Sequence, residues 1–206
     1  KIILGVDPGT RITGYGIIKV NGPQLTTIDY GCIRPPSKLH LAQRYRIIFE
    51  GLEKLIDLHH PEAVAVEMQF VLKNVQSAIK LGMAKAMVLL AAARKEIPVY
   101  EYAPTKAKQA VVGRGQASKW QVQRMIQTIL RLPSLPQPED AADALALALC
   151  HAGDLSDRLR KNQKTNRTFI TQEALCTNQF AASSKKKLPP QPLLNAAESA
   201  IACKSL

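Results

Sequence analysis

The chain has 206 residues, of which 46% are hydrophobic and 21% charged, a globular composition that excludes a wholly disordered, collagen-like or coiled-coil protein. This length allows one α/β domain of ordinary size with a short appendage, but not two large lobes. Lys and Arg number 28 against 16 Asp and Glu, a net charge of +12. The first partners to consider are therefore nucleic acid and an anionic membrane surface.

No stretch of the sequence predicts a membrane span or a secretory signal. The longest apolar stretch, around Met83 to Ala93, is interrupted by Lys85, and the apolar run that ends at Asp7 is too short for a signal peptide. The four cysteines form no CxxC pair, so they predict neither a zinc site nor a disulfide framework. We expect a soluble cytoplasmic protein with reduced thiols and no membrane contact.

The first 60 residues predict an antiparallel meander and a helix. Asn21-Gly22 is a hairpin signal between two runs typical of strands. Apolar residues then recur at helical spacing from Leu41 to Ile56, and the pattern stops at residues 59–61, His-His-Pro. The expected strands cover residues 2–6, 14–20 and 25–34.

The following residues alternate between strand and helix patterns. Ser118 and Gln121 fit a capping box that opens a helix, and a proline-rich linker precedes a last helix that begins at Pro138 or Glu139. The expected strands are 63–68 and 98–102, and the expected helices are 77–96, 104–112, 119–132 and about 139–151. This order predicts an α/β fold with one mixed five-stranded sheet flanked by helices.

The composition changes after residue 153. Residues 154–206 lose hydrophobic periodicity, are rich in Asn, Gln, Ser, Thr and Lys, and carry nine basic and four acidic side chains. We predict one folded domain over 1–153 and a basic, mostly disordered tail over 154–206. The alternative for the tail is a short terminal helix from Leu194 to Cys203.

Two acids stand at the ends of predicted strands. Asp7 ends the first strand before a Pro-Gly-Thr turn, and Glu67 ends the apolar strand that begins near residue 63. Either acid alone has an ordinary explanation, because a lone aspartate often caps a turn and a lone glutamate can be solvated. Together they place carboxylates at the edge of the sheet.

A second acid pair opens the last predicted helix. Asp140 and Asp143 are three residues apart, so their side chains project from one face, where like charges destabilise a helix. The residues around them are alanine and leucine, which solvent exposure explains poorly. Glu139 points elsewhere, and its ordinary role is to favour the helix N-terminus electrostatically.

If these four carboxylates converge, their repulsion requires protons or cations. Hard oxygen ligands favour Mg²⁺ or Mn²⁺, and two such ions about 4 Å apart can activate water and stabilise both oxygens of an in-line attack on a phosphodiester. Residues 67–131 carry eleven basic and three acidic groups, a surface suited to a polyanion. The sequence therefore favours a metal-dependent nuclease.

Several dispersed motifs carry a family resemblance over residues 1 to about 153. They are 3–10 (ILGVDPGT) with 13–16 (TGYG), 66–67 (VE) with Phe70, 73–74 (KN) and 77–78 (SA), 108–113 (KQAVVG) and 140–146 (DAADALA). In this order they resemble the RuvC family of bacterial Holliday junction resolvases, in the RNase H-like superfamily. The resemblance implies an RNase H-like sheet and a homodimer that nicks a four-way DNA junction symmetrically with Mg²⁺, in recombination and repair. It also implies that the metal ligands are Asp7, Glu67, Asp140 and Asp143.

Further residues match positions that the family uses on DNA. Phe70 is expected to stack on a base unpaired at the junction, its ordinary alternative being a core phenylalanine. Lys108 and Lys119 match basic positions near the scissile phosphate. Additional contacts to the DNA backbone are expected from Lys73, Lys106 and Arg114. Each basic residue alone is more often a solvated surface charge.

The sequence leaves several alternatives open. The helix over 77–96 has small residues that suit packing on a second subunit, or equally burial within its own domain. The sequence does not decide whether the protein associates with the RuvA–RuvB branch-migration complex, a further partner that the resemblance suggests. The alternative functions are a DNA-binding protein without catalysis, a related nuclease acting on RNA hybrids or linear DNA, and an actin-like ATPase, which the length disfavours.

Overall fold

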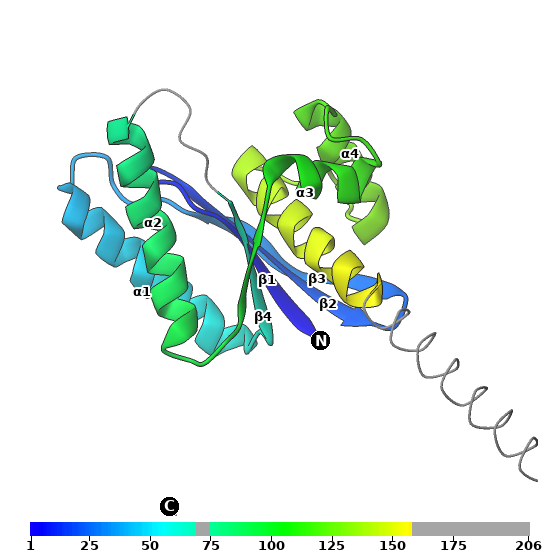
Figure 1. The fold of residues 1–206 in the computed structure, drawn as a ribbon, viewed down its shortest axis with the longest axis horizontal. Coiled ribbons are helices and arrows are strands. Elements are labelled where there is room, and N and C mark those ends of the chain that lie inside the picture. Colours follow the sequence, from blue (N-terminus) through cyan, green and yellow to red (C-terminus); the bar gives the residue numbers. More distant parts are fainter. Residues whose placement is uncertain (69–74, 158–206) are drawn as a thin grey trace, which may run out of the picture. The chain divides into compact units, whose positions relative to one another are not determined.

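The computed structural model of the chain describes residues 1–68 and 75–157, in which five strands form one mixed sheet with the order β3-β2-β1-β4-β5 (Figure 1). β1, β2 and β3 pair antiparallel, whereas β4 and β5 continue the sheet parallel to β1. The strands are β1 (Ile2–Asp7), β2 (Thr13–Asn21), β3 (Gln24–Ile33), β4 (Ala63–Glu67) and β5 (Val99–Tyr102). The five-stranded mixed sheet expected from the sequence is confirmed, and its helices flank both faces.

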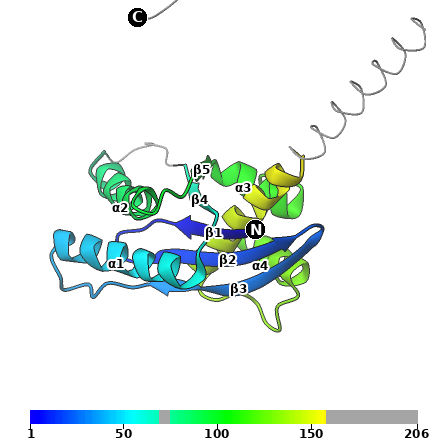
Figure 2. The same ribbon diagram turned by 90° about the horizontal axis from the view of Figure 1, so that it is seen from below.

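Two helical layers cover the two faces of this sheet (Figures 1 and 2). The labelled helices are α1 (Leu41–His59), α2 (Val75–Ala93), α3 (Pro104–Val112) and α4 (Lys119–Leu130), and a further helix covers residues 139–157. One buried cluster joins the sheet to α1 and α2, and another joins it to α3, α4 and helix 139–157.

Alternation along the strands assigns each side chain to a face. In β1, Leu4 and Val6 pack toward α1 and α2, whereas Ile3 packs toward helix 139–157. In β4, Ala65 likewise faces helix 139–157. Because side chains alternate with a period of two, the last residues of both strands point to the side of that helix.

Helix 139–157 lies directly on the sheet because glycines in β1 and β2 leave room for its backbone. A Cβ atom on Gly5 would lie 2.0 Å from the Ala144 carbonyl oxygen, and one on Gly14 would lie 2.0 Å from that of Asp140. A Cβ atom on Gly16, also in β2, would lie 2.7 Å from the Leu145 side chain. These distances exclude any side chain, so the glycines set the height of the helix above the sheet.

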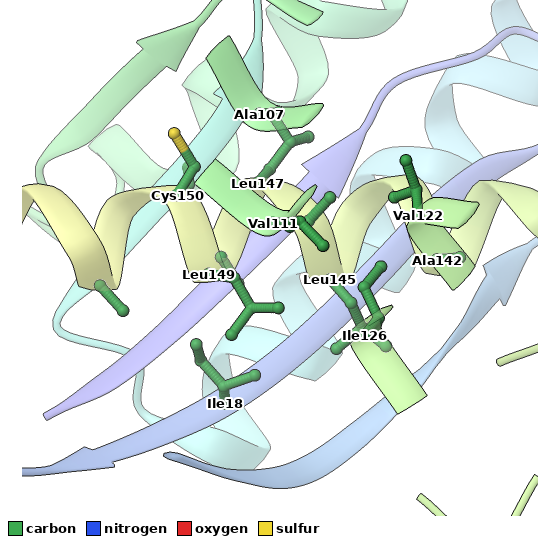
Figure 3. Close-up of a cluster of buried hydrophobic side chains, with 14 of the residues drawn as sticks. Ile18, Ala107, Val111, Val122, Ile126, Ala142, Leu145, Leu147, Leu149 and Cys150 are labelled. Carbon is green, nitrogen blue, oxygen red and sulfur yellow. The ribbon is translucent and has the colours of Figure 1, made fainter. Parts of the chain in front are cut away.

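The helix is buried from both sides. Figure 3 shows Leu149 next to Ile18 of β2 and Leu147 next to Ala107 of α3, within one cluster of buried side chains. Helix 139–157 therefore packs between the layer of α3 and α4 on one side and the glycines of β1 and β2 on the other.

Several element boundaries differ from those expected. The capping box of Ser118 and Gln121 is confirmed, but α2 begins and ends earlier than residues 77–96. The last helix continues beyond His151 at least to residue 157, because Leu155 packs on the core and Asp154 pairs with a lysine of α3 at 2.6 Å. The predictions for residues 158–206, including a helix from Leu194 to Cys203, lie outside the described residues.

By length and hydropathy alone, α2 is able to cross a bilayer, and only 22% of its apolar window is buried. A single helix of this kind is weak evidence for a membrane, since helices of soluble proteins meet the same criteria. Its face with Ala84, Val88 and Ala92 is packed on the sheet.

We predict that Gly5→Ala lowers the free energy of unfolding by about 2 kcal/mol or more, because the new methyl group meets backbone atoms that cannot give way. Gly153→Ala, in helix 139–157 with nothing within 4 Å of the added methyl group, is the control and is expected to stabilise by roughly 0.5–1 kcal/mol. Urea unfolding midpoints measure both. Equal tolerance of the two substitutions would contradict the close contact.

Candidate active site

The structure brings together the four acids that the sequence singled out. Val6 pairs with Val66 in parallel register, so Asp7 and Glu67 end neighbouring strands at the same edge of the sheet and on the same face. Helix 139–157 begins over this edge, since the Asp140 carbonyl lies against Gly14 of β2. Asp140 and Asp143 thus occupy its first turns beside the strand ends.

The charges of these carboxylates act on one another, which indicates that they lie near one another. Burial, together with the charges of Glu67, Asp143 and Asp140, raises the pKa of Asp7 to about 7. Burial and the Asp143 charge also raise the pKa of Glu67, and burial is the main cause of the raised pKa of Asp143. A partly buried group of carboxylates with raised pKa values requires protons or a cation to offset its repulsion.

Two lysines lie on the α3–α4 side of the acids. The Lys119 ammonium is 2.9 Å from the Glu139 carboxylate and 3.9 Å from that of Asp143. The positive charges of Lys108 and Lys119 partly offset the rise in the pKa values of Glu67 and Asp143. A hollow of about 150 Å³ is lined by these two lysines and these two acids. Positive charge next to the acids is the arrangement that lets a phosphate approach them.

The turn after Asp7 is fixed by three contacts that sequence reasoning missed. The hydroxyl of Thr13, which is 0% exposed, donates to the Gly9 carbonyl at 2.9 Å and accepts from the Gly9 N–H at 3.3 Å. The Arg44 guanidinium of α1 donates to the Thr10 carbonyl. These contacts fix the backbone that immediately follows Asp7.

A divalent cation fits the chemistry of these donors. Four carboxylates provide the hard oxygen ligands that Mg²⁺ and Mn²⁺ prefer, and burial together with the neighbouring acids raises the pKa of Asp7, which a bound cation would reverse. Within residues 1–68 and 75–157, however, no three acidic, histidine or cysteine side chains stand close enough together to hold one ion as they are placed. The residues fit the ion by type and charge rather than by a closed ligand cage.

The other predicted DNA contacts are placed differently. Lys106 is turned away from the acids, because its ammonium lies 2.6 Å from Asp154 and 5.0 Å from the ring centre of Tyr102. Arg114 is exposed in the connection between α3 and α4. Phe70 and Lys73 lie outside the described residues.

The size of a hollow does not locate this site. A larger hollow of about 630 Å³ lies between the β2–β3 turn and the end of α4, and no carboxylate lines it. The glycines that seat the last helix were also missed in the sequence. Isolated glycines at positions 5, 14 and 16 within strands are the pattern that indicates close backbone approach.

A family model described as crossover junction endodeoxyribonuclease RuvC matches residues 3–151. The chain belongs to the RuvC family. A crossover junction endodeoxyribonuclease RuvC from Protochlamydia amoebophila is 62% identical over 151 residues, which cover 73% of this chain and 90% of the relative. Its counterpart from Heliobacterium modesticaldum is 48% identical over 155 residues, covering 75% and 96%.

Solved structures give the same result. RuvC of Thermus thermophilus, in complex with Holliday junction substrate, superposes with a TM-score of 0.71 at 35% identity, covering 75% of this chain and 94% of that chain. A yeast mitochondrial Holliday junction resolvase, with a TM-score of 0.53 and 14% identity, shares the fold. The chain is thus a RuvC-family nuclease with an RNase H-like fold, which leaves the ATPase alternative without support.

Asp7→Asn is predicted to stabilise the metal-free protein at pH 8. Ionisation of Asp7 costs stability as the pH rises from the ordinary pKa of 3.8 to the raised pKa of about 7, and each pKa unit corresponds to about 1.4 kcal/mol, so the gain is on the order of 4 kcal/mol. It shrinks as the pH falls toward the ordinary value of 3.8, because the wild-type carboxyl is then protonated.

Thermal unfolding in EDTA at pH 8 and pH 5 measures this difference. Asp57→Asn, which removes an exposed partner of Lys95, is the control and is expected to change stability by less than about 1 kcal/mol at both pH values. A variant at Asp7 that is no more stable than wild type at pH 8 would contradict the raised pKa.

Proposed function

We propose that the chain resolves Holliday junctions as a homodimer, by paired symmetric nicks that depend on divalent cations, two Mg²⁺ per site with Mn²⁺ able to substitute. The observation that supports this proposal is the convergence of Asp7, Glu67, Asp140 and Asp143 from β1, β4 and helix 139–157 on one face of the sheet. The junction specificity follows from the RuvC family and from the Thermus thermophilus relative described with junction substrate.

In this proposal the four carboxylates hold the cations and the lysines hold the phosphate. Bound divalent cations supply an activated water and stabilise charge on the attacking and leaving oxygens. Lys108 and Lys119 draw the scissile phosphate toward carboxylates that would otherwise repel it. The contacts of Thr13 and Arg44 keep the backbone beyond Asp7 in place, which preserves the direction of its side chain.

The test is cleavage of a labelled four-way junction and a matched linear duplex, each with Mg²⁺ or EDTA. Wild type is expected to nick the junction only with Mg²⁺, and Glu67→Gln to lose at least about 100-fold in rate while it still binds the junction. Glu62→Gln is the matched control, since it removes an exposed carboxylate at the other end of the same strand. Equal cutting of both DNAs would indicate a general nuclease, and binding without cleavage a non-catalytic junction protein.

The homodimer is supported by the outer face of α2. Exposed apolar residues recur along it at helical spacing, opposite the face that packs on the sheet. They are Val75, Ile79, Met83 and Leu90. A two-fold dimer through this stripe carries two active sites, which suits a junction that is itself nearly two-fold and explains paired nicking.

Met83→Glu is expected to convert the dimer to a monomer, because it buries a charge in the apolar contact. Light scattering after gel filtration measures the mass. Leu58→Glu on α1 is the control, since Leu58 is 71% exposed against 46% for Met83 yet lies outside the stripe. Dimers in both variants would place the subunit contact elsewhere.

The wider setting is proposed from the family alone. We expect the protein to act in the cytoplasm in recombination and repair, with an association with RuvA–RuvB as a further hypothesis. Stacking of Phe70 on a junction base and backbone contacts by Lys73, Lys106 and Arg114 remain predictions. For Lys106, a DNA contact requires release from Asp154.

A further inference from the structure

Two connections leave the sheet side by side at the active-site edge, on the side of β3. Thr13 at the start of β2 pairs with Ile33 at the end of β3, so the connection 8–12 and the connection 34–40 are neighbours. Arg44, on the first turn of α1, joins them by donating to the Thr10 carbonyl. The two connections and α1 therefore form one surface.

Arg11, Arg34 and Lys38 are exposed on this surface, and none of them takes part in an ion pair with another described residue. No Asp or Glu occurs between Asp29 and Glu50. Many other basic side chains are paired with carboxylates, namely Arg46, Lys85, Arg94, Lys95, Lys106 and Lys119. A group of exposed cations without acidic neighbours is uncompensated charge that suits a polyanion.

This surface adjoins the carboxylates through Cys32. Cys32 pairs with Gly14 of β2, and the Asp140 carbonyl lies against Gly14, so the end of β3 is one strand away from the start of helix 139–157. The charge of Asp140 acts on the Cys32 thiol. Two strand spacings, about 10 Å, separate β3 from β1, so the surface is within a few nucleotides of Asp7.

We propose that Arg11, Arg34 and Lys38 bind the sugar–phosphate backbone of the duplex that leaves the active site on the β3 side. Lys108 and Lys119 lie on the opposite side of the acids, so a DNA backbone that crosses the carboxylates meets cations before and after them. The contacts are to phosphates, which position the duplex without reading its sequence. This inference rests on the proposed function, since it assigns an arm of the same substrate.

The test is the salt dependence of DNA binding in EDTA, measured by fluorescence anisotropy on a four-way junction and on a linear duplex. The logarithm of the binding constant falls with the logarithm of salt by about 0.9 per phosphate contact. The triple variant Arg11→Gln, Arg34→Gln, Lys38→Gln is expected to lower the junction slope by about 2 to 3 relative to wild type. The corresponding Arg–Lys exchange variant, Arg11→Lys with Arg34→Lys, is expected to keep the wild-type slope.

The matched control removes three exposed cations far from the acids, Lys19→Gln, Lys54→Gln and Arg131→Gln. Lys19 pairs with Ile2 at the opposite end of the sheet, and Arg131 follows α4 beside the β2–β3 turn. An unchanged slope in the first variant, or an equal loss in both, would overturn the proposal. Because binding in EDTA requires no cleavage, a wild-type protein that fails to cut junctions would refute the proposed function and still leave this comparison decisive.

Discussion

The seat of helix 139–157 on Gly5, Gly14 and Gly16 is the contact on which the site depends. Asp7 and Glu67 are fixed by strand pairing, but Asp140 and Asp143 reach them only if the helix backbone lies against the sheet. The helix backbone can lie this close to the sheet only because the strands have glycines and the helix has alanines where the two meet. Any larger side chain in the seat separates the two acid pairs, so packing at the core and chemistry at the edge cannot be varied independently.

The buried acids at this edge of the sheet also reduce the stability of the metal-free fold. Burial raises the pKa of Asp7 to about 7, and the same burial affects Glu67 and Asp143. Lys119 offsets part of this repulsion through Glu139 and Asp143 without closing the site. The metal-free protein is therefore less stable than its core allows, which is the usual relation between a preorganised active site and the scaffold that holds it.

Much of this architecture was predictable because local rules and tertiary contacts agree. The strands, the capping box at Ser118 and the acid at each strand end follow from hydrophobic pattern and turn residues. The expected end of the last helix at His151 was too early, since the helix continues at least to residue 157, where Leu155 and Asp154 gain partners only in three dimensions. The contacts of Lys106 and Arg44 also could not be predicted from sequence. Lys106 pairs with Asp154, which is far away along the chain, and Arg44 donates to a backbone carbonyl 34 residues away.

The parity of the strands has a consequence for how such chains can diverge. Asp7 and Glu67 face helix 139–157 because each lies two residues beyond a residue of that face, Gly5 and Ala65. Inserting or deleting one residue within β1 or β4 would turn the terminal carboxylate to the layer of α1 and α2. Length changes are therefore tolerated in the turns between strands but not inside them, and the spacing from the first strand residue to its acid is as constrained as the acid itself.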